Sequence, residues 1–194
     1  MMPLLAVKNL AVRADMHGRS FDIVEDVTFS LGKGEILGLV GESGSGKSVT
    51  CRALLRLLPG ANLAIAAGEI LFEGRDFARM SDAEIRNERG ASVGMIFQNP
   101  ASHLDPVMSI GDQVAESIVL HRDVSKAEAW SQTIDLLRHV GIPDPERRAR
   151  NFAHEFSGGM KQRAMIAAAL ACDPQLLIAD EPTTALDVTV QAQI

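Results

Sequence analysis

Residues 41–48 read GESGSGKS, and this stretch decides the fold. A short apolar run, EILGLV at 35–40, precedes it, and a helical pattern of apolar residues begins at Gly46. Glycines let such a loop curl so that several backbone N–H groups point inward at an anion, and the N-terminus of the following helix adds its positive dipole end. The sequence therefore predicts a phosphate-binding loop between a buried strand and a helix.

The loop has the Walker A pattern in the context that this motif requires, after a predicted strand and at the start of a helix. We expect Lys47 to contact the β- and γ-phosphates of ATP and the Ser48 hydroxyl to ligate Mg²⁺. The predicted ATP-binding residues are Gly41, Ser43, Gly44, Ser45, Gly46, Lys47, Ser48 and Val49.

A second motif lies near the end of the chain, where the apolar run QLLIA at 175–179 is followed by Asp180 and Glu181. A carboxylate at the C-terminal end of a buried strand lies where an α/β sheet binds ligands. We expect Asp180 to hold Mg²⁺ through its water shell and Glu181 to orient or deprotonate an attacking water. Alone such a run is weak, but together with the phosphate-binding loop it reads as a Walker B motif.

The rest of the chain alternates between strand and helix patterns. A polar helix at 81–90 begins with Ser81 and carries Glu84 three residues later, which is a capping box. Strands are predicted at 4–13, 21–31, 68–73 and 92–98, with Asp15, His17 and Gly18 in the turn of the first hairpin. Strands alternating with helices predict an α/β fold with a mainly parallel core sheet and an antiparallel hairpin region.

Residues 100–156 differ in character, because their apolar residues carry helical spacing. Helices are predicted at 109–119, 125–140 and 145–153, and an Ala-rich helix at 157–172. We interpret 100–156 as a helical subdomain inserted into an ATP-binding core formed by 1–99 and 157–194. Trp130 falls in this block and is expected to be a core residue.

Composition limits the possible partners. Hydrophobic residues make up 46% and charged residues 23%, as in a soluble globular protein, and the net charge is −6. This acidic balance and an aromatic content of 4% argue against nucleic acid as a partner. The N-terminus lacks signal-peptide features, and no apolar run is long enough to span a bilayer. Cys51 and Cys172 lack metal-ligand spacing and are expected to be buried thiols.

Three further motifs resemble those of one family. Residues 156–163, FSGGMKQR, resemble the signature motif usually written LSGGQ, with Ser157 as a helix cap and two glycines that allow close approach to an anion. Gln98 resembles the Q-loop, and TALD at 184–187 resembles the D-loop. The order of these motifs over essentially the whole chain is that of the ABC-transporter ATPases.

This resemblance implies a P-loop NTPase fold of ABC type that couples MgATP hydrolysis to transport. Glu181 and Gln98 would be catalytic, and Ser48, Gln98 and Asp180 would hold Mg²⁺. Signature residues would meet the nucleotide of a second ATP-binding subunit, in a homo- or heterodimer. Those residues are Ser157, Gly158, Gly159, Lys161 and Gln162, and Asp187 is the D-loop residue.

A finer resemblance is to the dipeptide/oligopeptide importer family, which also includes nickel importers. Residues 94–116 and the FSGGMKQR variant resemble that family, although Asn99 and His103 stand where Asp and Ser or Thr are expected. Transmembrane permease subunits, contacted by Gln98 and residues 99–116, and an extracytoplasmic solute-binding protein would be partners. The protein would lie at the cytoplasmic face of the cell membrane.

Two features depart from the family pattern. No histidine occupies the position of the switch histidine, and the chain ends shortly after Glu181, so we expect it to be truncated at its C-terminus. The aromatic residue that stacks on adenine in the family would fall near Ala14, where this chain has none, and Phe21 is a poor substitute by register. Two alternatives stay open: a soluble ABC ATPase acting on nucleic acid or ribosomes, and a fragment that binds nucleotide without hydrolysing it.

Overall fold

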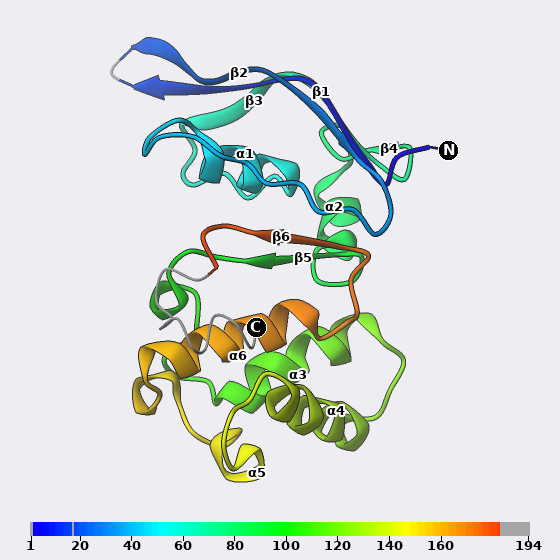
Figure 1. The fold of residues 1–194 in the computed structure, drawn as a ribbon, viewed down its shortest axis with the longest axis vertical. Coiled ribbons are helices and arrows are strands. Elements are labelled where there is room, and N and C mark those ends of the chain that lie inside the picture. The colour runs from blue at the N-terminus through cyan, green and yellow to red at the C-terminus, as the bar shows by residue number, and fades with distance from the viewer. Residues whose placement is uncertain (1, 17, 183–194) are drawn as a thin grey trace. The chain divides into compact units, whose positions relative to one another are not determined.

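The computed structural model describes residues 2–16 and 18–182 (Figure 1). The chain divides into two compact units, Met1–Arg86 and Asn87–Ile194, and each is described by itself. The predicted core of 1–99 and 157–194, with a helical subdomain at 100–156, is a different division of the chain and stays a prediction.

The first unit is built on a four-stranded antiparallel sheet in the order β2-β1-β3-β4. Its strands are β1 (Leu5–Met16), β2 (Arg19–Leu31), β3 (Leu63–Phe72) and β4 (Arg75–Asp76). The predicted hairpin is confirmed, but its strands are longer than expected. Asp15 pairs with Ser20 across the ladder, so it belongs to β1 and not to the turn. His17 lies outside the described residues.

Helix α1 (Lys47–Leu54) packs on this sheet (Figure 1), and its residues Ala53 and Leu54 join a core of buried strand residues. The predicted strand at 35–40 is wrong: this segment forms no strand, and Ile36 and Val40 are 100% and 94% exposed. A strand needs a neighbour for its backbone N–H and C=O groups. Among the described residues, no strand pairs with 35–40.

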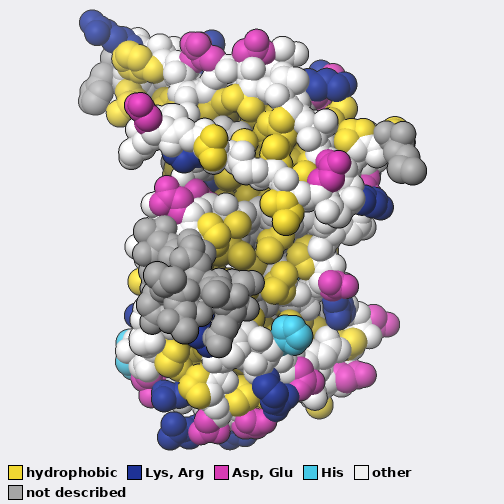
Figure 2. Space-filling view, viewed as in Figure 1, with side chains coloured by type: hydrophobic (Ala, Val, Ile, Leu, Met, Phe, Trp, Pro, Cys, Tyr) yellow, Lys and Arg dark blue, Asp and Glu magenta, His cyan; other side chains and the backbone are white. Residues whose placement is uncertain are grey.

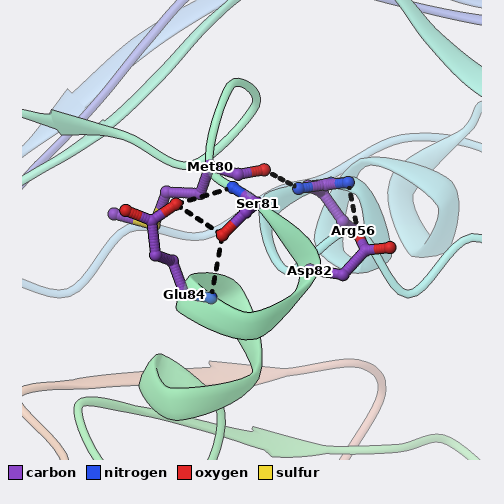
Figure 3. Close-up of polar contacts among 5 residues, drawn as sticks. All are labelled: Arg56, Met80, Ser81, Asp82 and Glu84. Carbon is purple, nitrogen blue, oxygen red and sulfur yellow. Dashed lines mark hydrogen bonds and ion pairs between the residues drawn. The ribbon is translucent and has the colours of Figure 1, made fainter.

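Helix α2 (Asp82–Glu88) begins with the predicted capping box. Glu84 Oε2 accepts hydrogen bonds from the backbone N–H and the hydroxyl of Ser81, at 2.8 and 2.6 Å (Figure 3). The hydrogen bond to the Ser81 hydroxyl, together with that to its backbone, lowers the pKa of Glu84. Arg56 lies just past α1 and donates to the Met80 carbonyl and, at 2.8 Å, to Asp82. These contacts tie the end of α1 to the start of α2.

The second unit combines a pair of parallel strands with helices. The strands are β5 (Val93–Ile96) and β6 (Leu176–Ala179), and the helices are α3 (Ile110–His121), α4 (Lys126–His139), α5 (Pro145–Arg148) and α6 (Gly158–Leu170), with 3-10 turns η1 (Pro100–Ser102) and η2 (Ala153–Glu155). Serines at 109, 125 and 157 cap α3, α4 and α6 by accepting from backbone N–H groups. The strand pair supplies the parallel part of the predicted α/β fold.

Helix α6 lies between the strand pair on one side and α3 and α4 on the other (Figure 1). Small residues make this possible: a Cβ added at Gly94 of β5 would lie 2.3 Å from the Ala169 carbonyl oxygen. Trp130 packs against the helical core, as predicted.

The surface of the second unit mixes charges of both signs around α4 and α5, where Arg138 pairs with Asp135 and Glu146 (Figure 2). Cys51 and Cys172 form no disulfide; Cys51 is buried and Cys172 is half-buried. Within residues 2–16 and 18–182, every helix is too short or too polar to cross a membrane.

Candidate functional site

The predicted phosphate-binding loop lies in the first unit, and its backbone is curled. Lys47 Nζ donates to the carbonyls of Gly41 and Glu42, both at 2.8 Å. The loop backbone therefore folds around the ammonium group of Lys47. Gly44 and Gly46 have φ values of +83° and +86°, which side chains other than glycine rarely adopt. The loop therefore has the concave backbone that an anion site requires.

Close contacts explain why glycines stand at both ends of the loop. A Cβ at Gly41 would lie 2.7 Å from Ser45 Oγ, and a Cβ at Gly46 would lie 3.0 Å from the Ile23 carbonyl oxygen on β2. Gly46 is also the N-cap residue of α1, so its close approach to β2 limits where the helix can begin. A side chain at either position would crowd the residues around it, so the curl of the loop depends on glycine at both ends.

A second group of predicted site residues lies in the other unit, where β5 and β6 end side by side. The Asp180 N–H donates to the Ile96 carbonyl at 2.9 Å, which extends the strand pairing to the carboxylate residue. Gln98 Nε2 donates to Glu181 Oε2 at 2.6 Å, although the two residues are 83 positions apart. Parallel strands bring their carboxyl ends to one edge, so the predicted catalytic pair meets there.

The backbone at Glu181 is unusual. Its φ is +48°, in the left-handed region that costs a non-glycine residue about 1–2 kcal/mol. The following residue, Pro182, accepts a hydrogen bond from Gln162 Nε2 at 2.6 Å through its carbonyl. Glu181 is thus held through its side chain by Gln98, and the residue that follows it is held through its carbonyl by Gln162.

The predicted signature residues lie at the N-terminus of α6. Ser157 caps the helix by accepting from the Met160 N–H at 3.3 Å, and Ser157 and Gly158 are exposed, while Gly159 and Lys161 are half-buried. Gln162 is 1% exposed, and its side chain is hydrogen-bonded within its own chain. Its predicted role toward the nucleotide of a second subunit stays a prediction.

Other predicted residues are not brought together by the described structure. Ser48 and the half-buried Val49 belong to the first unit, whereas Gln98 and Asp180 belong to the second, so the Mg²⁺ ligand set stays a prediction. Asp187 lies outside the described residues.

Contacts around Gln98 were not predicted from the sequence. The ring of His103 stacks on Phe97 with centroids 4.1 Å apart, and the Asn99 side chain caps η1 by accepting from the Ala101 N–H. A signal existed for the second contact, since Asn followed by Pro is a typical turn start. None existed for the stacking, because it depends on how the turn folds back.

The structure also places the candidate for adenine stacking. Phe21 is directly opposite Ala14 in the β1–β2 register. Ala14 is 1% exposed and Phe21 is 51% exposed. Phe21 lies on the same strand as Ile23, whose carbonyl borders Gly46. An exposed aromatic ring therefore lies on the strand that contacts the phosphate-binding loop.

Comparison with known proteins finds relatives over nearly the whole chain. The model of the ABC transporter family matches residues 24–184. The oligopeptide transport ATP-binding protein OppD of Bacillus subtilis is 52% identical over 98% of this chain and 53% of its own length. The dipeptide transport ATP-binding protein DppD of the same organism is 48% identical over 100% of this chain and 58% of its own. The chain thus spans about half the length of these relatives.

Solved structures agree on the fold. A dimeric post-hydrolysis structure of the ATP-binding cassette MJ0796 bound to ADP and Pi superimposes with a TM-score of 0.88, at 26% identity and over 98% of this chain and 79% of that one. A second dimeric structure of MJ0796, described as a bacterial ABC transporter cassette, gives 0.87.

Proposed function

Because the chain belongs to the ABC transporter family, we propose that it is the ATP-binding and ATP-hydrolysing part of a subunit that energises import of di- or oligopeptides. The observation that carries the hydrolytic part is the hydrogen bond between Gln98 and Glu181. It puts an amide and a carboxylate together beside Asp180, at the strand ends where α/β proteins bind ligands. The choice of peptides rests on the names of the relatives.

The chain's own residues have distinct roles in this proposal. The N–H groups of the loop at 41–48 surround the phosphates, and Lys47 exchanges its two loop carbonyls for phosphate oxygens. Glu181 accepts the proton of the attacking water, which Gln98 helps to orient. Ser48, Gln98 and Asp180 would hold Mg²⁺, which neutralises charge developing on the transferred phosphoryl group.

The partners in this proposal follow from the exposed end of α6. Ser157 and Gly158 are exposed at the N-terminus of α6, and a helix N-terminus attracts an anion. We propose that this anion is the nucleotide of a second ATP-binding subunit. Permease subunits would contact residues 99–116, a solute-binding protein would complete the system, and the complex would place this chain at the cytoplasmic face of the membrane.

Substitution of Glu181 by glutamine tests the catalytic assignment. Glu181→Gln keeps the size of the side chain but removes the base, so turnover in the assembled transporter should fall by about 100-fold or more. ATP binding should persist and closed dimers should accumulate. Phosphate release, nucleotide titration and size-exclusion chromatography measure these three outcomes.

Lys47→Ala is the matched control, because it should remove MgATP binding as well as turnover. Unchanged ATP affinity in Lys47→Ala would refute the phosphate site. Wild-type turnover in Glu181→Gln would refute the role of Glu181 while leaving the site intact.

Cross-linking tests the permease contact. Val107 lies in the segment after Gln98 and is 80% exposed, whereas Ser109 is 8% exposed and caps α3, so a cysteine belongs at position 107. With Cys51 and Cys172 replaced by alanine, Val107→Cys should cross-link to cytoplasmic permease loops. Ser131→Cys, exposed on α4, should not. Equal cross-linking at both positions, or none at Val107 in any nucleotide state, would contradict this contact.

A further inference from the structure

Gln162 is a polar side chain inside the second unit. It follows Ser157, Gly158 and Gly159 by about one turn of α6, and it is 1% exposed. Burying an amide is unfavourable unless it is hydrogen-bonded. Its Nε2 donates at 2.6 Å to the carbonyl of Pro182, and its Oε1 accepts no hydrogen bond from the described residues. The side chain thus makes a single hydrogen bond to the described residues, and its acceptor is the residue that follows Glu181.

The segment that accepts this hydrogen bond has an unfavourable backbone conformation. Glu181 has a left-handed backbone, and it precedes a proline, whose ring disfavours helical conformations in the residue before it. Both effects work against the observed conformation. The Asp180 N–H bond to Ile96 restrains the segment from one side and the Gln162 bond to Pro182 from the other. The backbone of Glu181 therefore lies between two tethers.

We infer that Gln162 is a positioning residue that makes the location of the Glu181 carboxylate depend on the location of α6. The inference rests on the proposed function, in which Glu181 is the base. A hydrogen bond of 2.6 Å is lost once donor and acceptor separate by about 1 Å more. The N-terminus of α6 carries the exposed Ser157 and Gly158, so an anion that draws on this end of the helix also acts on the Pro182 carbonyl. One side chain then links the signature end of the helix to the catalytic carboxylate of the same subunit.

Gln162→Met is the variant that tests the link, because it keeps the length and volume of the side chain and removes the donor. In the assembled transporter, kcat should fall by about 10- to 100-fold, as for a catalytic group displaced by about 1 Å. KM for ATP and the melting temperature should stay close to wild type. Gln175→Met is the matched control: Gln175 is exposed just before β6, and its substitution should leave kcat, KM and melting temperature unchanged.

Hydrogen exchange supplies a readout that does not need turnover. In Gln162→Met, the amides of Asp180 and Glu181 should exchange faster, while those of residues 163–170 in α6 keep their protection. Unchanged exchange in the 176–182 peptide overturns the tether, and faster exchange with wild-type kcat overturns the positioning role. A loss of ATP binding together with kcat would reduce Gln162 to a packing residue.

The two proposals fail in different ways. If wild-type turnover does not depend on Lys47, the proposed function fails, and the exchange experiment still decides whether Gln162 holds Pro182. If turnover depends on Lys47 and Glu181 but not on Gln162, the proposed function stands and this inference falls.

Discussion

Gly46 combines two constraints at a single position. Its backbone is left-handed, and a Cβ would press on the Ile23 carbonyl oxygen at 3.0 Å and on Val24 Cγ2 at 3.2 Å. Gly44 has nearly the same φ, but a Cβ there would meet nothing within 4 Å. The two glycines of one loop therefore separate the cost of backbone strain from the cost of crowding.

Alanine at each position should reveal that difference. Gly44→Ala should lower the free energy of unfolding by about 1–2 kcal/mol, which is the cost of a left-handed backbone. Gly46→Ala should lower it by about 1–3 kcal/mol more, because the loop must also shift away from β2. Urea unfolding without nucleotide measures both. Equal losses in the two variants would show that β2 does not constrain the loop.

At the scale of elements, the β1–β2 register decides what lies next to the loop. Ala14 of β1, which is small and buried, pairs with Phe21 of β2, which is large and exposed. β2 is also the strand that borders Gly46. A slip by one residue would move Phe21 to the other face of the sheet, because side chains alternate along a strand. The register therefore supports Phe21 as the ring that stacks on adenine.

Phe21→Leu should weaken ATP binding, since stacking of a base on an aromatic ring contributes about 1–3 kcal/mol. We expect an increase in Kd of about 10-fold for ATP and no change for inorganic tripolyphosphate, which has no base. Phe29→Leu, a half-buried position on the same strand, is the control and should leave both affinities unchanged. If Phe21→Leu weakens ATP and tripolyphosphate alike, the ring does not contact the base.

At the scale of the whole molecule, the segment at 35–40 is where the structure differs most clearly from the sequence pattern, which predicts a buried strand. It is apolar and leads into the loop, yet Ile36 and Val40 are exposed. Apolar burial stabilises a protein only where the side chain leaves water, so these residues contribute little to the stability of the 194-residue chain.

Alanine substitutions measure that contribution. Ile36→Ala and Val40→Ala should each change the free energy of unfolding of this chain by less than about 0.5 kcal/mol, as at other exposed sites. Ile70→Ala and Val7→Ala, at positions that are 0% exposed, are the buried counterparts. Ile70→Ala should cost about 2–5 kcal/mol and Val7→Ala somewhat less. A loss at Ile36 as large as that at Ile70 would mean that another strand covers the segment.

The sequence by itself determined whatever depends on neighbouring residues. Turns, helix caps and side-chain alternation depend on residues only a few positions apart, so short patterns predict them. These patterns predicted the glycines and lysine of the loop, the Ser81–Glu84 capping box, the capped helices and the strand that precedes Asp180. Their existence was predictable, although their ends were not.

Only the tertiary structure decided which residues that are distant in the sequence contact one another. Gln98 and Glu181 are 83 positions apart, and Gln162 and Pro182 are 20 apart, so no local pattern shows that they meet. The same reason explains why the strand predicted at 35–40 is wrong, since a segment becomes a strand only where another part of the chain pairs with it. Buried backbone groups and side-chain amides must be hydrogen-bonded, and the packing of the chain decides which partner lies within reach.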